Sequence, residues 1–284
     1  MLRLRAKHRT EMRYAGEVRE SVNEIRLCPR GNGRQQVELC EIVTDPPTEV
    51  HRHVDAFGNE VAWFQIERPH TGLIVDAHAV VTVTPHPPMP QKAPWGLLLD
   101  RALQDRMSDY LAPSALVHWP ESVDYFAQGL EVDDIQDVGV WLRAMERAVN
   151  DSIRYERGST GVDTTVERLI QVRRGVCQDM AHLFLALCRR RGVPARYVSG
   201  WLFQPGRDEP GESHAWCDAW VPGAGWVEFD PTHPDPNLDH YIRIGVGRDY
   251  FDVPPFRGTY VGAPTEKMSV TVEIADIGLP TTAG

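Results

Sequence analysis

The most restrictive feature of the sequence is the segment "CQDMAHLFLALCRRRG", residues 177–192, which predicts a helix with almost no polar face. Side chains at offsets of three, four, seven and eleven from Cys177 share one stripe of such a helix. They are Met180, Ala181, Phe184 and Cys188. Leu183, Leu185 and Leu187 widen the stripe until little of the helix can face water. Such a helix must be covered on nearly every side, so the segment predicts the central helix of a layered fold.

Residues 1–86 predict a different architecture, because their apolar residues alternate with polar ones. Five stretches rich in β-branched residues are separated by turn signals such as "RGNG", "DPP" and "DAFGN". This pattern favours an antiparallel β-sandwich. The segment "TPHPPMPQKAPWG" then brings five prolines, which can continue neither a strand ladder nor a helix. We therefore expect a proline-rich linker at residues 87–96.

After the linker the periodicity becomes helical and then returns to that of strands. Apolar residues recur at helical spacing over residues 135–149, and Thr164 with Glu167 has the spacing of a capping box before a short helix. Beyond the central helix, four extended runs alternate with period 2. Helices followed by strands predict an α+β domain over residues 97–284, with helices packed on one side of an antiparallel sheet.

The charge of the chain limits its partners. With 40 acidic and 30 basic residues, the formal net charge is −10. This argues against a general binder of nucleic acid or of an anionic membrane, since either needs a basic surface. No stretch approaches the roughly 20 apolar residues of a membrane span, and the first residues lack the apolar core of a secretory signal. We therefore expect a cytoplasmic protein.

The cysteines also indicate a cytoplasmic protein. The five cysteines are an odd number, are scattered along the chain and form no C-x-x-C pair. They indicate neither a disulfide framework nor a zinc knuckle, so we expect reduced thiols.

Cys177 lies at the predicted first turn of the central helix, just after a glycine-containing turn. Unpaired backbone N–H groups and the positive end of the helix dipole favour an anion at such a position, and they lower thiol pKa values from their reference of about 8.5. The alternative is that Cys177 is buried as a small hydrophobe, as free cysteines usually are. Position alone leaves both alternatives open.

A nucleophilic thiol needs a base, and His214 is the best-placed histidine. His182 lies on the central helix itself, about 140° around from the cysteine, and is expected to be structural. His214 opens "SHAWCDAWVPGAGWVEFDPTH", in which "VPGAG" joins two extended runs as a hairpin turn. His214, Trp216, Asp218 and Trp220 share one face of the first strand, which we expect to line an open cleft. The opposite face is small and apolar and is predicted to turn to the core.

Asp230 is the candidate to orient His214. If a three-residue loop closes the hairpin, Val221 pairs with Gly225 and Asp230 lies diagonal to His214 on the same face. A one-residue change of register would turn Asp230 away. Glu228 is farther from His214 and is the weaker candidate.

Each of these residues alone has a structural explanation, His214 as a strand histidine and Asp230 as a turn former before a proline. Their combination is more specific. A cysteine at the start of a central helix, followed by a histidine on one strand and an aspartate on the next, is the layout of a Cys-His-Asp enzyme.

Long segments of the chain resemble bacterial transglutaminase-like proteins, which are often described as cysteine proteases. The similarity lies in "RRGVCQDMAHLFLALCRRRGVPARYVSGWL", "ESHAWCDAWVPGAGWVEFDPTH" and "GVGRDYFDVPPFRGTYVG". "RLCPR" and "HVDAFGNEVAWFQIERPH" are similar to the β-rich N-terminal region that accompanies that catalytic domain. Two departures, Met180 where the family often has Phe and His233 where Asn is common, touch no expected catalytic position.

The resemblance implies a papain-like α+β fold with Cys177 as nucleophile, His214 as base and Asp230 as the acid that orients it. It also implies a thioester intermediate. Water then gives hydrolysis of a peptide or isopeptide amide, which is the first hypothesis, and an amine gives transglutaminase-type acyl transfer, which is the second. A non-catalytic peptide-binding scaffold is the third hypothesis, disfavoured because all three positions are intact.

The remaining expectations concern the surroundings of the thiol. The side chains of Gln178 and Tyr155 are candidates to help the Cys177 N–H stabilise an oxyanion, and Trp216 is either a packing residue or a wall of the cleft. We expect no cofactor, no calcium and no metal, since the other histidines offer no convincing ligand spacing. The expected partner is a peptide or protein substrate.

Overall fold

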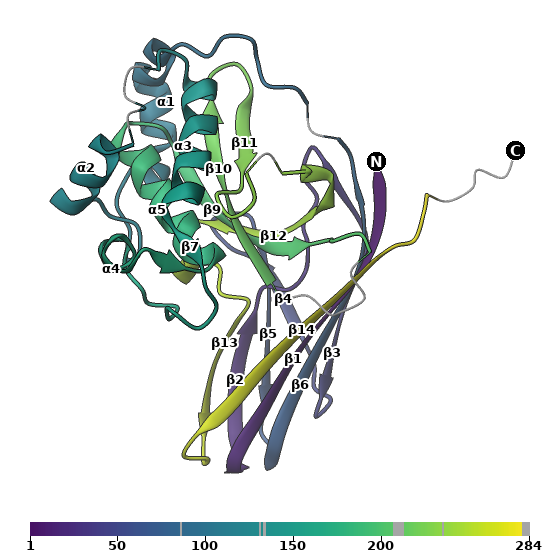
Figure 1. Cartoon of the computed structure of the whole chain (residues 1–284). Helices are drawn as coiled ribbons and strands as arrows, with labels where there is room; N and C mark the ends of the chain where they lie inside the picture. The colour runs from purple at the N-terminus through teal and green to yellow at the C-terminus, as the bar shows by residue number, and fades with distance from the viewer. Residues whose placement is uncertain (86, 131, 133–134, 207–212, 235, 280–284) are drawn as a thin grey trace, which may run out of the picture.

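The computed structural model describes residues 1–85, 87–130, 132, 135–206, 213–234 and 236–279. Within these ranges the strands form three four-stranded antiparallel sheets and one short parallel pair, and the helices gather on one side of a single sheet (Figure 1). The chain is therefore an α+β protein, as predicted. No helix in the described part of the chain is both long and apolar enough to span a membrane.

Two of the sheets form the predicted antiparallel sandwich. Their strand orders are β14-β1-β6-β3 and β13-β2-β5-β4. The first six strands are β1 (Leu2–Val18), β2 (Glu20–Ile25), β3 (Gln35–Asp45), β4 (His51–Val54), β5 (Glu60–Ile66) and β6 (His70–Val83). Inward-facing residues such as Ile25, Phe64 and Val75 are fully buried between the sheets. This burial explains the alternation of apolar and polar residues in the sequence.

The last two strands belong to these sheets and differ from the sequence-based prediction. β13 (Phe256–Val261) pairs with β2, and β14 (Glu266–Asp276) pairs with β1. The prediction that placed all residues after 97 in one second unit is therefore wrong for these strands. Alternation in "EKMSVTVEIAD" indicates a strand but does not reveal its partner, which is the free edge of the long first strand. Whether the remaining parts fold as separate domains stays a prediction.

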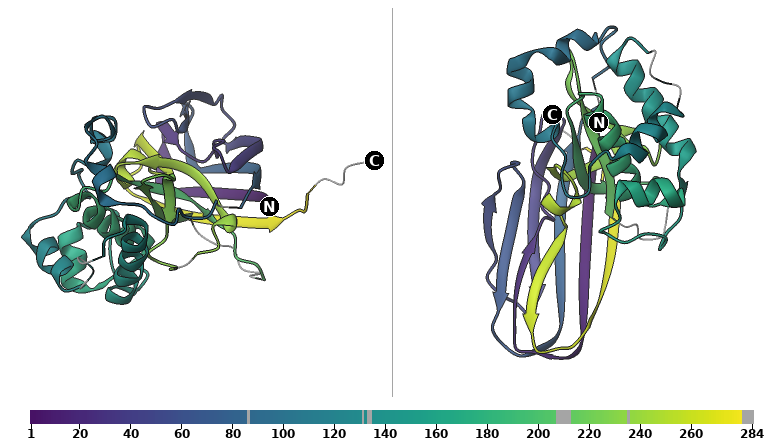
Figure 2. Two further views of the ribbon diagram at one scale, coloured as in Figure 1. Left: turned by 90° about the horizontal axis from the view of Figure 1, so that it is seen from above. Right: turned by 90° about the vertical axis from the view of Figure 1, so that its left-hand side faces the viewer.

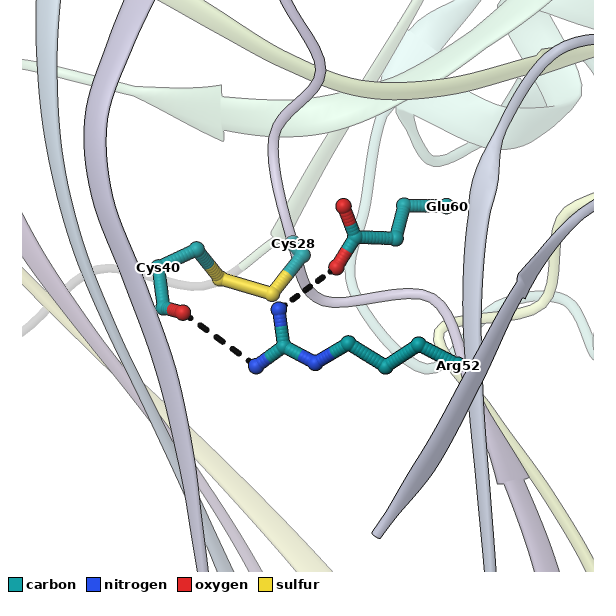
Figure 3. The surroundings of a disulfide bond; sticks show 4 residues. All are labelled: Cys28, Cys40, Arg52 and Glu60. Carbon is teal, nitrogen blue, oxygen red and sulfur yellow. Dashed lines mark hydrogen bonds and ion pairs between the residues drawn. A yellow bond between two sulfur atoms is a disulfide. The ribbon is translucent and has the colours of Figure 1, made fainter.

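Cys28 and Cys40 form a disulfide with a Cα–Cα distance of 5.8 Å, so the expectation of reduced thiols is wrong for this pair. Cys28 follows β2 and Cys40 lies in β3, and the tertiary fold brings the two sulfurs together although their spacing matches no motif. Arg52 lies beside the bond, donating to the carbonyl of Cys40 and pairing with Glu60 (Figure 3). The other cysteines, 177, 188 and 217, are free thiols.

The third sheet carries the predicted central helix. Its order is β11-β10-β9-β12, with β9 (Ala195–Leu202), β10 (Ser213–Val221), β11 (Gly225–Phe229) and β12 (Tyr241–Gly247). The central helix, α5 (Cys177–Arg190), packs against β9 and β10 on one side and against other helices on the other (Figures 1 and 2). Residues 178–189 of α5 are all buried, so the sequence predicted both the helix and its place correctly.

The other helices are α1 (Arg101–Arg106), α2 (Glu121–Gln128), α3 (Val138–Ser152) and α4 (Val166–Val172), with short 3₁₀ turns η1 (Trp95–Leu99), η2 (Ser108–Tyr110), η3 (Leu238–His240) and η4 (Tyr250–Asp252). Of these helices, α2, α3 and α4 pack against α5. The predicted capping box is displaced by one residue. Thr165, not Thr164, accepts the N–H of Arg168 and caps α4, while Thr164 accepts the N–H of Gly161 in the preceding turn.

Candidate active site

Cys177 is the first residue of α5 and is partly exposed. The short pair β7 (Arg154–Tyr155) and β8 (Arg174–Gly175) leads the chain into this helix start. Asp179 fixes the turn, because its carboxylate accepts the N–H of Val176 at 2.8 Å and the hydroxyl of Thr160 at 2.7 Å. Asp179 is not among the predicted site residues, although an acid at the third helical position is a capping signal.

The hairpin β10–β11 brings His214 to Asp230 in the predicted register. Val221 pairs with Gly225 and Cys217 pairs with Phe229, so Asp230 follows the last paired residue. The Nε2 atom of His214 lies 2.7 Å from Oδ2 of Asp230. This bond leaves Nδ1 as the ring nitrogen available to Cys177.

His214 and Asp230 each stabilise the charged form of the other. Burial alone would lower the pKa of His214, but the charge and hydrogen bond of Asp230, together with a hydrogen bond from the protonated ring to the sulfur of Cys177, raise it to about 10. Burial alone would raise the pKa of Asp230, but the charge of His214 and the surrounding hydrogen bonds hold it well below its usual range. The protonated imidazole is therefore the stable form of His214 at neutral pH, and it is the natural counterion of a thiolate.

Asp230 is held by several donors. It is completely buried, and its Oδ2 atom accepts hydrogen bonds from Tyr241 at 2.6 Å and from His233 at 3.1 Å in addition to the bond from His214. Its Oδ1 atom accepts the N–H of Thr232. In the sequence, His233 stands out only as a departure from the family pattern and as a histidine without a convincing ligand spacing. Nothing in the sequence indicates Tyr241, because its contact depends on the pairing of β12 beside β9.

His214, Asp230 and His233 place three ligand atoms within 4.8 Å of one another, a set that is able to hold a metal ion. Both histidine nitrogens already lie within hydrogen-bond distance of the same carboxylate oxygen. These bonds account for the arrangement, and we assign the three residues to the hydrogen-bond network.

A cavity of about 330 Å³ opens at the thiol. Cys177 and His214 line it together with Tyr155 and Gln178, two of the residues predicted to lie near the oxyanion. Tyr155 is 46% exposed on β7. The side-chain amide of Gln178 donates to the carbonyl of Val162 at 2.9 Å, which occupies one of its two N–H groups.

The strand face that carries His214 is not the open cleft that the sequence analysis predicted. Trp216 is fully buried, stacks near the ring of His214 and packs against Tyr241, so it is a packing residue. Asp218 is also fully buried and forms ion pairs with Arg196 and Arg243. The prediction failed because Tyr241 of β12 clusters with Trp216, and Phe57 of the N-terminal region packs against this cluster. The opposite face turns to the α5 core, as predicted.

Two other predicted side chains have structural roles. Glu228, the weaker candidate for the orienting acid, pairs with Arg34 and Arg243 and does not contact His214. The ring of His182 is buried and accepts the N–H of Tyr250 at 3.2 Å. Burial lowers the pKa of His182 to about 3, so it is neutral.

Comparisons with known proteins agree with this architecture. The family described as the transglutaminase-like superfamily matches residues 133–231, and the bacterial transglutaminase-like N-terminal region matches residues 4–82. The uncharacterized protein ML0607 of Mycobacterium leprae is 37% identical over 280 residues, covering 96% of this chain and 99% of its own. The protein-glutamine gamma-glutamyltransferase of Pseudomonas aeruginosa is 33% identical over 84 residues, covering 26% of this chain and 12% of its own.

A solved structure has the same fold. It is described as a "putative cysteine protease" from Cytophaga hutchinsonii, with a TM-score of 0.79, 21% identity, and coverage of 99% of this chain and 92% of the other. In this chain a cysteine at the start of the central helix lines one cavity with a histidine, and that histidine is hydrogen-bonded to an aspartate at the end of the adjacent hairpin. The chain belongs to the transglutaminase-like superfamily, with the bacterial transglutaminase-like N-terminal region preceding the core.

Proposed function

We propose that the protein is a thiol-dependent hydrolase of peptide or isopeptide amide bonds. The observation that carries this proposal is the hydrogen-bonded pair His214–Asp230 beside Cys177, with Cys177 and His214 lining the same cavity of about 330 Å³. Nucleophile, base and orienting acid are the three parts that thiol catalysis requires.

In the proposed reaction the sulfur of Cys177 attacks the amide carbonyl carbon. The carbonyl oxygen becomes an oxyanion, for which the N–H of Cys177 at the helix start is a suitable donor. The protonated His214 then gives its proton to the leaving amine as the C–N bond breaks, which leaves a thioester on Cys177. His214, now neutral, takes a proton from water as the water attacks the thioester, and the C–S bond breaks to release the acid and to restore the thiolate of Cys177 beside the protonated His214. Asp230 fixes the ring of His214 throughout and stabilises its positive charge.

Acyl transfer to an amine is the alternative function, using the same residues. The similarity of 84 residues to a protein-glutamine gamma-glutamyltransferase favours it. We place hydrolysis first because water needs no second binding site. A peptide-binding scaffold without activity is less favoured, because such a scaffold has no use for a buried His–Asp pair beside a thiol.

A digest of a peptide library that includes glutamine-containing peptides tests the proposal, with and without an added primary amine. Wild type and Cys177→Ala are compared by mass spectrometry. Cleaved products that require Cys177 support the hydrolase, and peptides joined to the amine support the transferase instead. Products that are identical in the two proteins would contradict both.

The protein lies either in the cytoplasm or in an oxidising compartment, and the disulfide bears on which of the two it is. The expectation of a cytoplasmic protein depended partly on reduced thiols, and the Cys28–Cys40 disulfide weakens it, because such bonds persist mainly in oxidising compartments. Fractionation of the native host, followed by thiol labelling of the recovered protein, distinguishes the two locations.

A further inference from the structure

Helix α3 holds the backbone on both sides of the Asp230 side chain. Oε1 of Glu146 accepts the N–H of Asp230 at 2.6 Å. One turn further along α3, Nδ2 of Asn150 donates to the carbonyls of Pro231 at 2.9 Å and Thr232 at 3.0 Å. The turn that carries the triad acid is therefore bound to a helix that contributes no residue to the triad.

Glu146 is unusual for such a contact because its side chain is completely buried. Its second oxygen pairs with Arg143 at 2.9 Å, and the Arg143 guanidinium lies over the ring of Phe229, the residue before Asp230. Burial raises the pKa of Glu146 to about 7, against the opposing effects of Arg143 and of the Asp230 N–H. Among the described contacts, the buried carboxylate of Glu146 has two polar partners, the guanidinium of Arg143 and the N–H of Asp230. Its hydrogen bond to the backbone is therefore directed at the proposed triad.

The groups that face Glu146 come from several elements. Arg143 lies on its own helix, Asp230 follows β11, and Tyr241 of β12 is close enough for Glu146 to raise its pKa. Behind Asp230 lie His214 and His233, both bonded to its carboxylate. Arg143 is the cation in direct contact with Glu146. The negative charge of Asp230 repels that of Glu146 and so raises the pKa of Glu146.

We propose that Glu146 is a positioning residue of the triad, whose negative charge fixes the backbone of Asp230 and thereby the orientation of the His214 ring. This inference rests on the proposed thiol catalysis. A charged acceptor forms a hydrogen bond roughly twice as strong as a neutral one, so protonation of Glu146 loosens the turn. The activity should then decline as the pH falls through the range in which Glu146 takes up a proton.

The test is the pH dependence of kcat and KM for wild type, Glu146→Gln and Arg143→Gln, with the best substrate of the library. Wild type should lose activity with a midpoint near pH 7. Glu146→Gln should lack this step and show a kcat lowered by about 10-fold at alkaline pH, with KM unchanged because Glu146 does not line the cavity. Arg143→Gln should move the step to higher pH, since loss of the cation raises the pKa of Glu146 further.

Asn150→Ala is the matched comparator, because it loosens the other side of the same turn without changing a charge. It should lower kcat and keep the wild-type midpoint. A wild-type midpoint retained in both Glu146→Gln and Arg143→Gln, or an effect confined to KM or to the thermal midpoint, would overturn the inference.

The same variants separate this inference from the proposed function. If wild type shows no turnover that depends on Cys177, the proposed function fails. The rate of alkylation of Cys177 by iodoacetamide, followed peptide by peptide, then gives the second readout. A pH step in this rate that is absent in Glu146→Gln supports the positioning role, and identical profiles contradict it.

Discussion

At the scale of single residues, Asp230 is the acceptor on which the hydrogen bonds of the candidate site converge. One of its oxygens accepts bonds from His214, His233 and Tyr241, and the charge of Asp230 holds the pKa of His214 near 10. Asp230→Asn keeps the size but removes the charge. We expect kcat/KM to fall by on the order of 100-fold or more and the pKa of His214 to fall, as measured by NMR titration of the ring. His233→Asn removes a half-exposed partner and should change kcat/KM by only about threefold.

Asp230→Asn should also change the pH dependence of the free energy of unfolding. The pKa of His214 is raised from 6.5, so its contribution is complete below pH 6.5 and is lost as the pH rises through about 10. The pKa of Asp230 is lowered from 3.8, so its contribution is present above that value and is lost as the pH falls. Urea unfolding should therefore show the largest difference between wild type and Asp230→Asn between about pH 4 and 6.5. A difference that grows above about pH 9 would contradict this assignment of charges.

Gly200 shows how closely the backbone of β9 approaches the site. A Cβ atom at this position would lie 2.5 Å from the ring of Trp216 and would also overlap the carbonyl of Ile242. Gly200→Ala must displace Trp216, which stacks near His214, so we expect a loss of about 1–3 kcal/mol in the free energy of unfolding together with a lower kcat. Gly96→Ala, with no atom near the added methyl group, is the control and should leave both quantities unchanged. Equal effects of the two substitutions would show that the tight approach is not responsible.

At the scale of elements, the start of α5 is fixed by a side chain within its own first turn. Asp179 accepts the N–H of Val176, the residue before the proposed nucleophile Cys177, and thereby orients the start of the helix. Asp179→Ala should lower the free energy of unfolding by about 1 kcal/mol and slow the alkylation of Cys177, because the helix start loses its cap. Asp179→Asn keeps an acceptor oxygen and should retain most of both. If Asp179→Ala alkylates at the wild-type rate, the cap does not control the thiol.

At the scale of the whole molecule, local sequence patterns correctly predicted the features of the fold that depend on residues close together in the chain. The helix from Cys177 and the register that brings Asp230 to His214 follow from periodicity and from one turn. The pairing of β14 with β1, the disulfide and the cover over Trp216 depend on segments far apart in the sequence. Periodicity identifies a strand or a buried face, but it does not specify the surface that meets it.

The disulfide joins the segment after β2 to strand β3 and is remote in sequence from the proposed triad, so its effect should be on stability and not on catalysis. The two cysteines are 12 residues apart in the sequence. Loss of a cross-link that closes such a loop lowers the free energy of unfolding by about 2–4 kcal/mol. We expect the double variant Cys28→Ala/Cys40→Ala to unfold at lower urea concentration than wild type while its kcat/KM at room temperature is unchanged. A reductant should bring wild type to the same midpoint and should not affect the double variant. Cys188→Ala, which removes a buried free thiol, is the control, and it should keep the full response to reductant because it retains the cross-link. Equal stability of wild type with and without reductant would show that the cross-link does not stabilise the sandwich.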